Sequence, residues 1–470
     1  MQPIDALAAL WRAAGQPESA LETVELTGSE PVLPSSFAVG TAAQASIAAA
    51  GLAAAELWRL RTGRRQRLTV NMRHAAAEFR SERYLRVDGK SLPEPWDKIA
   101  GAYRCGDGGW VRLHTNFPHH RDGMLKLLRC EHDRDAVERA LAGWEAAALE
   151  TAAAEAGLVA TAMRTFAQWD AHPQGRAVAA LPVLTIERIG DAPPLPLPRA
   201  DRPLGGIRVL DLTRVIAGPV CGRTLAAHGA EVLLVTAAHL PSIAPLVIDT
   251  GRGKLSTSLD LRGPAGRERL GALLDKANIF VQGYRPGAIA TLGFGPEQAA
   301  QRRPGIVYVS LSAYGHEGPW AGRRGFDSLV QTASGFNAAE AEAAGSAAPK
   351  ALPCQALDHA AGYLMAFGAM TALARRATEG GSWHVRVSLA QAGHWIRSLG
   401  RVPGGLACAD PRFEDVRDLL EDSESGFGRL TAVRHAAQLS ETPTRWARPS
   451  VPLGTHPASF DALSSVACSG

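Results

Sequence analysis

The sequence lacks the features that mark several common classes of protein. Its six cysteines lie far apart with no CxxC pair, which disfavours a zinc site or a disulfide framework and is typical of a reducing cytoplasm. No run reaches the roughly eighteen apolar residues of a membrane span, and the N-terminus does not resemble a signal peptide. The net charge is only +4 over 470 residues, without a basic stripe. We therefore expect a cytoplasmic protein that binds neither nucleic acid nor membrane.

Motifs of several nucleotide enzymes and hydrolases are also missing. No GxGxxG, P-loop lysine motif or GxSxG occurs, and Thr236 stands where a nicotinamide enzyme would place a ribose-binding acid. His316, His359 and His384 show no metal-ligand spacing, so we expect packing or surface roles for them and no metal.

What the chain does contain is an alternation of short apolar runs and helical patterns over residues 204–400. The run 206–213, a turn, a helix of small residues over 220–228 and the run 230–235 together form a βαβ unit. Further buried strands are expected, among them 306–312. This pattern predicts an α/β fold with a Rossmann-like, doubly wound parallel sheet in a large domain.

The rest of the chain predicts a smaller α+β domain and flanking segments. Residues 103–113 form a hairpin pattern with a glycine-rich turn, and several short helical patterns follow it. The expected division is a partial repeat of the large domain over 1–94, a small α+β domain over 95–191, a Pro-rich linker over 192–203, the large domain over 204–400 and a C-terminal return segment over 401–470.

An internal repeat relates residues 41–75 to residues 358–392 without a gap. Both copies predict a helix of small residues, a glycine turn, a strand and the start of a helix. The first copy places Thr41 at its helix start and the second places Asp358 there. Either residue makes a good helix cap, which is the simplest explanation of Asp358. The alternative is a nucleophilic carboxylate at the positive end of a helix, which would leave the first copy catalytically silent.

Six stretches, in order, resemble the family III CoA transferases, also called the CaiB/BaiF family. They are DLTRVIAGPVCGRTLAAHGAEV (211–232), RGKLSTSLDLRGPAGRERL (252–270), VQGYRPGAIATLGFG (281–295), VSLSAYGHEGPW (309–320), RGFDSLVQTASG (324–335) and the helix at Asp358. The resemblance implies that Asp358 is catalytic. It would form an aspartyl anhydride and then an aspartyl-CoA thioester while CoA moves from an acyl-CoA donor to a carboxylic acid acceptor.

The same resemblance implies which residues contact CoA, which would be a substrate and not a permanently bound cofactor. They are Val215, Ile216, Ala217, Leu259, Arg262, Gly283, Tyr284 and Arg324. The two arginines suit phosphate groups, although solvated surface arginines would look the same in the sequence. Acyl-CoA and a small carboxylic acid are the expected partners, together with a second copy of the chain in a homodimer.

The sequence also departs from the family pattern. Thr236 and Thr291 replace positions that usually carry a charged residue, which lowers the expected affinity for phosphate. A small-domain half precedes the large domain, as if two incomplete copies had been fused. Two alternatives therefore stay open, an α-methylacyl-CoA racemase-like enzyme and a non-catalytic acyl-CoA-binding protein with a degenerate site. Phe326 occupies the position of the racemase histidine, which removes one of two bases and disfavours the first alternative.

Overall fold

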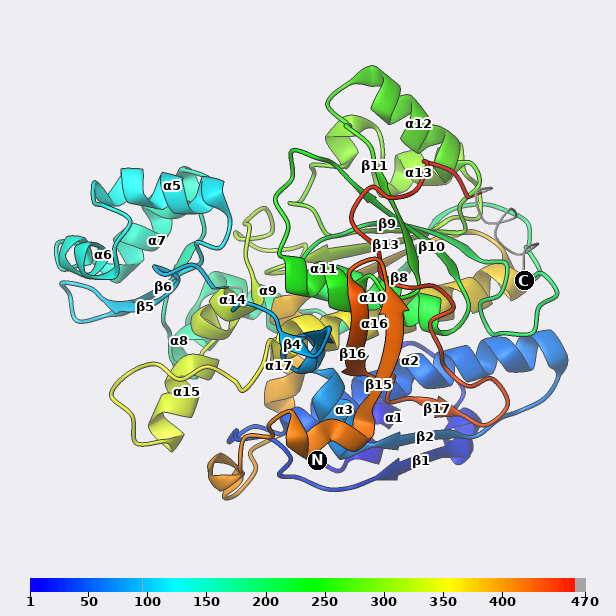
Figure 1. The fold of residues 1–470 in the computed structure, drawn as a ribbon, viewed down its shortest axis with the longest axis horizontal. Helices are drawn as coiled ribbons and strands as arrows, with labels where there is room; N and C mark the ends of the chain where they lie inside the picture. The colour runs from blue at the N-terminus through cyan, green and yellow to red at the C-terminus, as the bar shows by residue number, and fades with distance from the viewer. Residues whose placement is uncertain (95, 461–470) are drawn as a thin grey trace.

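The computed structural model describes residues 1–94 and 96–460, and a seven-stranded sheet lies at its centre (Figure 1). In spatial order its strands are β11 (Lys254–Ser258), β10 (Glu231–Thr236), β9 (Arg208–Leu212), β12 (Ile279–Gln282), β13 (Val307–Ser312), β14 (Ser382–Ser388) and β8 (Leu184–Gly190). Only β8 pairs antiparallel. The strand order reverses between β9 and β12, so this edge is the switch point at which doubly wound sheets bind ligands. The predicted α/β fold is confirmed.

Helices cover both faces of this sheet, among them α10 (Ala217–Ala227), α12 (Pro264–Leu274), α13 (Pro296–Arg302) and α16 (Ala356–Glu379). The same part of the chain contains α11 (Ala244–Thr250), α17 (Leu389–Ser398) and the short 3₁₀ turn η2 (Ala290–Leu292), while α14 (Asp327–Ala333) and α15 (Phe336–Ala343) lie away from the sheet, toward the small domain (Figure 1). Alternate strand residues feed two cores, because Val281 packs in the core that contains α10 and α16 while Phe280 packs with α12. Burial on both faces explains why the central strands β12 and β13 are mostly apolar.

The small domain projects to one side of the molecule (Figure 1). Its three-stranded sheet comprises β5 (Gly101–Arg104), β6 (Trp110–Leu113) and β7 (Ala160–Ala162), and its helices are α5 (Pro118–Leu128), α6 (Arg134–Leu141) and α7 (Ala146–Glu155). Tyr103 pairs with Val111, as the predicted hairpin requires. Two helices, α8 (Phe166–Ala171) and α9 (Pro173–Ala180), then lead the chain back to β8. Strand β8 falls within the range predicted for the small domain, 95–191, but it belongs to the seven-stranded sheet of the large domain.

The two ends of the chain build a third region together. The N-terminal elements are α1 (Pro3–Ala13), η1 (Glu18–Thr23), β1 (Val24–Thr27), α2 (Val39–Thr62), β2 (Leu68–Asn71), α3 (Met72–Glu78), α4 (Ser81–Tyr84), β3 (Arg86–Val87) and β4 (Lys90–Ser91). The C-terminal elements are η3 (Gly405–Ala407), η4 (Glu414–Leu419), β15 (Leu420–Ser425), β16 (Gly428–Val433) and β17 (Gln438–Leu439). They form the sheets β1-β2-β17 and β15-β16-β3-β4.

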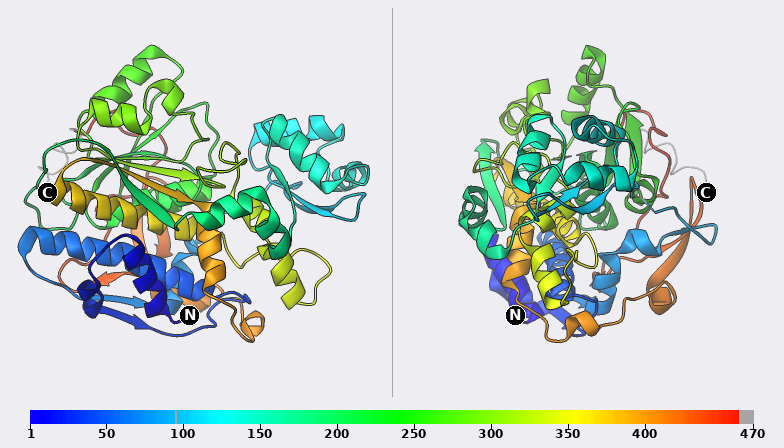
Figure 2. Two further views of the ribbon diagram at one scale, coloured as in Figure 1. Left: turned by 180° about the vertical axis from the view of Figure 1, so that it is seen from behind. Right: turned by 90° about the vertical axis from the view of Figure 1, so that its left-hand side faces the viewer.

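The structure confirms the internal repeat and shows how its two copies are joined. Helices α2 and α16 are both 24 residues long and lie side by side (Figures 1 and 2). Strand β2 pairs parallel with β1 and antiparallel with β17, just as β14 pairs parallel with β13 and antiparallel with β8. Strand β8 follows the first copy but completes the sheet of the second, and β17 follows the second copy but completes the sheet of the first. The two copies have therefore exchanged strands.

The described part of the chain contains no helix with both the length and the apolar character needed to cross a bilayer.

Candidate active site

Asp358 lies in the first turn of α16 and is almost buried, with 7% of its surface exposed. The helix begins at Ala356, two residues earlier than the sequence pattern predicts, and its N-cap residue Gln355 makes no side-chain cap. The explanation of Asp358 as a plain helix cap is therefore wrong. The carboxyl of Asp358 does not cap the N-terminus of α16.

Asp327, at the start of α14, caps the helix instead. Its Oδ2 accepts backbone N–H groups from Leu357 at 2.8 Å and from Asp358 at 2.9 Å. The first copy has an analogous arrangement, because Glu30 Oε1 accepts the N–H of Thr41 at 2.7 Å. Sequence reasoning missed Asp327, since nothing in the local pattern links it to a helix about thirty residues further on.

The surroundings of Asp358 oppose its negative charge. Burial raises its pKa well above the usual value, and the nearby carboxylates of Asp327 and Glu82 raise it further. Burial also raises the pKa of Asp327 to about 6, although the N–H donors of Asp358, Gln331 and Leu357 oppose that rise. Hydrogen bonds from three N–H groups stabilise the ionised form of Asp327, whereas no such donor in the described part of the chain opposes the rise in the pKa of Asp358. A carboxyl perturbed in this way at a cavity is a candidate catalytic group.

The neighbouring His359 is buried, and it contacts the other half of the chain. Its Nε2 lies 3.3 Å from Oε2 of Glu82 on α4, and its ring stacks on Phe79 with 5.4 Å between ring centroids. Burial alone would raise the pKa of Glu82, but the contact with His359 brings it below the usual value. The predicted packing role of His359 is thus confirmed, while its ion pair is new.

Asp358 sits where two cavities meet. The first, which we call the basic cavity, has a volume of about 400 Å³, and the second, which we call the N-terminal cavity, has a volume of about 640 Å³. Both are lined by Val215, Phe326 and Asp358. A thioester placed at Asp358 can therefore extend one part of the molecule into each cavity.

The basic cavity is rich in positive charge. Four arginines line it, namely Arg214, Arg285, Arg323 and Arg324. Among the residues that the structure describes, Asp358 is the only acidic one in its lining. The pKa of Arg324 is lowered by burial and by the nearby cation of Arg285. Guanidinium groups close enough to repel each other favour a bound anion such as a phosphate.

A third, mainly apolar cavity of about 170 Å³ adjoins the basic cavity. Predicted contact residues Leu259, Arg262 and Tyr284 line it, and so does Thr236. The residues that it shares with the basic cavity are His239, Leu240, Tyr284 and Ala288. The two cavities therefore form one continuous path toward Asp358.

The structure distributes the predicted CoA contacts along this path. Val215, Ala217, Gly283, Tyr284 and Arg324 line the basic cavity.

The remaining predicted contacts do not line the basic cavity. Ile216 faces the N-terminal cavity. Arg262 is bonded to Asp260 at 2.7 Å with 69% of its side chain exposed, so its charge is already paired at the surface. Thr291 is exposed and lines none of these three cavities.

Sequence reasoning missed several lining residues. Arg214 directly adjoins the predicted position Val215 in the loop after β9, so the strand-end rule could have found it. His119 and His120 also line the basic cavity. They come from the distant small domain, and no sequence spacing points to them.

The loop after β9 holds a strained backbone at the site. Val215 has a φ of 74°, a conformation that β-branched residues rarely adopt. The loop is anchored by Lys254, whose Nζ donates to Asp211 Oδ2 and to the carbonyl of Pro219, both at 2.8 Å. A Cβ at Gly222 would lie 2.3 Å from Asp211 Oδ2, so this position requires glycine. Residues 211–215 thus hold the backbone of the loop that forms part of the wall of the basic cavity.

Small residues in α16 serve helix packing. A Cβ at Gly362 would lie 2.6 Å from the carbonyl oxygen of Ala217 on α10. Gly362 therefore serves the packing of α16 against α10. The close approach of the two helices brings Asp358 next to the loop at Val215.

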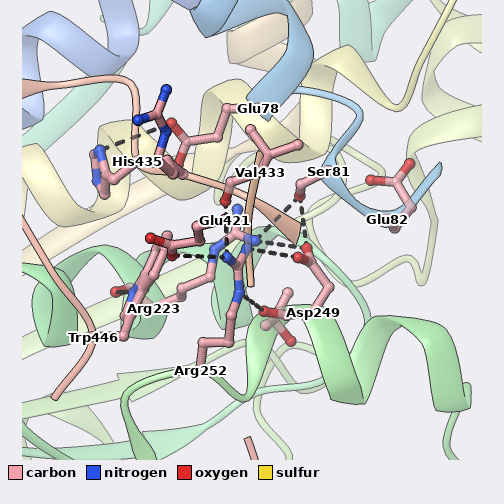
Figure 3. Close-up of polar contacts among 12 residues, drawn as sticks. Glu78, Ser81, Glu82, Arg223, Asp249, Arg252, Glu421, Val433, His435 and Trp446 are labelled. Atoms are coloured by element: carbon pink, nitrogen blue, oxygen red, sulfur yellow. Dashed lines mark hydrogen bonds and ion pairs between the residues drawn. The ribbon is translucent and has the colours of Figure 1, made fainter. Parts of the chain in front are cut away.

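A buried charge network joins the N-terminal half to the large domain (Figure 3). Asp249 accepts hydrogen bonds from Arg223 at 2.6 Å, from Arg252 at 2.8 Å and from the hydroxyl of Ser81 at 2.6 Å. Arg252 also donates to the carbonyl of Val433 at 2.8 Å. Because Ser81 precedes Glu82 on α4, this network fixes the N-terminal half against the site.

Comparisons with known proteins identify the family. The model of CoA-transferase family III matches residues 11–195 and 204–399. An acyl-CoA transferase of Gibberella moniliformis is 29% identical over 367 residues, which are 68% of this chain and 64% of that protein. An acetyl-coenzyme A transferase of Hypoxylon pulicicidum is 35% identical over 204 residues, 42% of this chain and 34% of that protein.

Two shorter similarities cover part of the chain. The mouse succinyl-CoA:glutarate CoA-transferase is 33% identical over 147 residues, 29% of this chain and 34% of that protein. A crystal structure of a hypothetical protein from Mycobacterium tuberculosis is 32% identical, with a TM-score of 0.39, over 42% of this chain and 57% of that one. The chain spans between about a third and two thirds of the curated relatives it matches.

Proposed function

The chain belongs to the family III CoA-transferases, and from this membership we propose that it moves CoA from an acyl-CoA to a carboxylic acid, with Asp358 as nucleophile. One observation carries the proposal. The nearly buried Asp358 lies at the junction of two cavities, one of which is lined by four arginines and no other acid.

The proposed reaction uses two covalent intermediates. The Asp358 carboxylate attacks the thioester carbonyl, so that a C–O bond forms, the C–S bond breaks and CoA leaves as a thiolate. The thiolate attacks the aspartyl carbonyl of the resulting anhydride, which releases the donor acid and leaves an aspartyl-CoA thioester. An acceptor carboxylate then repeats both steps in reverse order, which produces the new acyl-CoA and restores Asp358.

The basic cavity supports the binding of CoA. Its arginines offer charge-assisted hydrogen bonds to phosphate groups, and the adjoining apolar cavity can hold a flat, less polar group. The pairing of Arg262 with Asp260 makes it a weak candidate for such a contact, while Arg285 takes over the role that the sequence gave to Arg262.

The test is mass spectrometry of the protein incubated with acyl-CoAs and trapped with hydroxylamine. We expect a hydroxamate on the peptide that contains Asp358, and none in Asp358→Asn. Thr41→Ala changes the same position of the first copy, which lines none of the three cavities, and serves as the matched control that keeps the adduct. Binding of CoA esters without any adduct would favour a non-catalytic acyl-CoA-binding protein.

One observation favours a second candidate function, acyl-CoA racemase activity. The ring of His114 stacks on Phe326 with 3.8 Å between centroids and lines the N-terminal cavity, so a histidine does lie beside the position where the sequence lacks one. Burial lowers the pKa of His114 to about 3, however, which makes it a weak base. Deuterium exchange at the α-carbon, lost in His114→Ala, would favour this candidate over transfer.

A further inference from the structure

Of the predicted CoA contacts, only Val215 and Ile216 line the N-terminal cavity, although it is the larger of the two cavities at Asp358. We propose that this cavity holds the acyl group, and that the acid transferred is bulky and mainly apolar, of a medium-chain, branched or aromatic class. This inference rests on the proposed transfer of CoA.

Charge decides which cavity receives which part of an acyl-CoA. Besides Asp358, the carboxylates of Glu82, Glu94 and Asp327 line the N-terminal cavity. They would repel the phosphates of CoA, which the basic cavity attracts. With the thioester carbonyl at Asp358, the acyl group must therefore extend into the N-terminal cavity.

The same carboxylates argue against a second acidic group on the acid. Two arginines also line the cavity, but neither is placed as a buried partner for one. The guanidinium of Arg86 donates to the carbonyl of Leu85 at 2.9 Å and lies 4.4 Å over the ring of Phe413. Arg83 is exposed. A dicarboxylic acid would thus meet more negative than positive groups.

Apolar side chains from two regions line the cavity, beside polar ones such as Asn116 and Gln355. One group belongs to the loop after β9 and to the region of α11, and the other to residues between α4 and the small domain. They are Ile216, Ile243 and Leu246 in the first group, and Leu85, Leu92 and Trp96 in the second. Trp96 is 40% exposed, so its ring is accessible to a group bound in this cavity.

The volume of the cavity sets the size of the acyl group. At about 640 Å³ it falls within the range of about 300 to 1,000 Å³ that is typical of sites for drug-sized ligands. An acetyl group would leave most of this volume filled with water, and the apolar side chains of the wall would stay exposed to it. A larger apolar group would bury the wall and gain affinity in proportion to the area buried.

The test compares kcat/KM for acetyl-, succinyl-, octanoyl- and phenylacetyl-CoA with one acceptor acid. We expect the octanoyl or phenylacetyl ester to exceed both others at least tenfold. Leu246→Trp, which fills the N-terminal cavity, should reduce kcat/KM for the bulky esters about tenfold and spare acetyl-CoA. Leu311→Trp makes the same change in the basic cavity and should slow all four esters alike.

Leu246 is buried, so its variant can fail to fold, and Trp96→Ala provides a second route at an exposed position. It should lower kcat/KM for the bulky esters alone. A preference for acetyl- or succinyl-CoA, with the Asp358 adduct still formed, would overturn the inference and leave the proposed function intact. Absence of the adduct with all four esters would overturn the proposed function and the inference with it.

Discussion

At the scale of the residue, the carboxyl of Asp358 must lose its proton before it can attack a thioester. Burial and the carboxylates of Asp327 and Glu82 raise its pKa. We therefore expect kcat/KM to rise with pH above the usual range of an aspartate, because only the ionised form is a nucleophile. A pH–rate profile measures this, and a rate independent of pH between 5 and 8 would contradict it.

Glu82→Gln should move the rising limb of that profile to lower pH. The substitution keeps the shape of the side chain and removes one negative charge near Asp358, which lowers the pKa of Asp358. Glu94→Gln is the matched control, since Glu94 lines the same cavity but is exposed. Equal shifts in both variants would show that the effect is not specific to Glu82.

The raised pKa of Asp358 also predicts a pH-dependent cost in stability. The folded protein keeps this proton over a pH range in which the unfolded chain has lost it, so the stability contributed by the neutral carboxyl falls as pH rises above the usual aspartate pKa. Asp358→Asn should therefore increase the free energy of unfolding at pH 8 by more than about 1 kcal/mol, since each tenfold change in the dissociation constant is worth about 1.4 kcal/mol.

Urea unfolding of both proteins at pH 8 and near pH 3.5 checks the sign. At the lower pH both proteins carry a neutral side chain at position 358, so the increase in the free energy of unfolding should be smaller. A gain of the same size at both pH values would assign it to packing.

At the scale of the element, the loop between β9 and α10 keeps Val215 in a left-handed conformation. Such strain costs about 1–3 kcal/mol, while glycine in its place costs about 0.5–1 kcal/mol in entropy. Val215→Gly should leave stability unchanged or slightly higher and should raise KM for acyl-CoA, because the cavity wall loses a side chain and becomes mobile. Val215→Ala keeps the strain, and thermal unfolding of both variants separates the two effects.

The network between α4, α10 and α11 makes a second prediction at this scale. Asp249→Asn leaves Arg223 and Arg252 buried without their shared carboxylate, at a cost of about 3–5 kcal/mol in stability. Asp275→Asn is the control, because its pair with Arg302 is about half exposed and worth at most about 1 kcal/mol. Similar losses in urea unfolding would contradict the structural role of Asp249.

At the scale of the whole molecule, the exchange of β8 and β17 between the two copies makes each dependent on the other within one chain. The walls of the two cavities at Asp358 combine residues from the N-terminal segment, the small domain and the large domain. The expected homodimer stays a prediction, but specific activity should not depend on protein concentration. Assays over a thousandfold dilution, with sedimentation velocity at each end, would detect a loss on dilution that requires a second copy.

The sequence by itself determined the secondary structure and the repeat. Runs such as 306–312 become buried strands because apolar runs of this length are stable only in a covered sheet, and the common pattern of residues 41–75 and 358–392 gives equal helices. The resemblance to the family pointed to the loop at Val215, and the strand-end rule also favoured the turn at Tyr284, because parallel strands place their carboxyl ends along one edge.

Only the tertiary structure decided what surrounds Asp358. Asp327 caps its helix, Glu82 reaches His359 from the opposite half of the chain, and His114 stacks on Phe326 from the small domain. Each contact joins residues far apart in the sequence, where no local periodicity constrains them. The charge and hydration of a carboxyl depend on whatever lies within a few ångströms of it, so its chemistry is fixed only when the chain has folded.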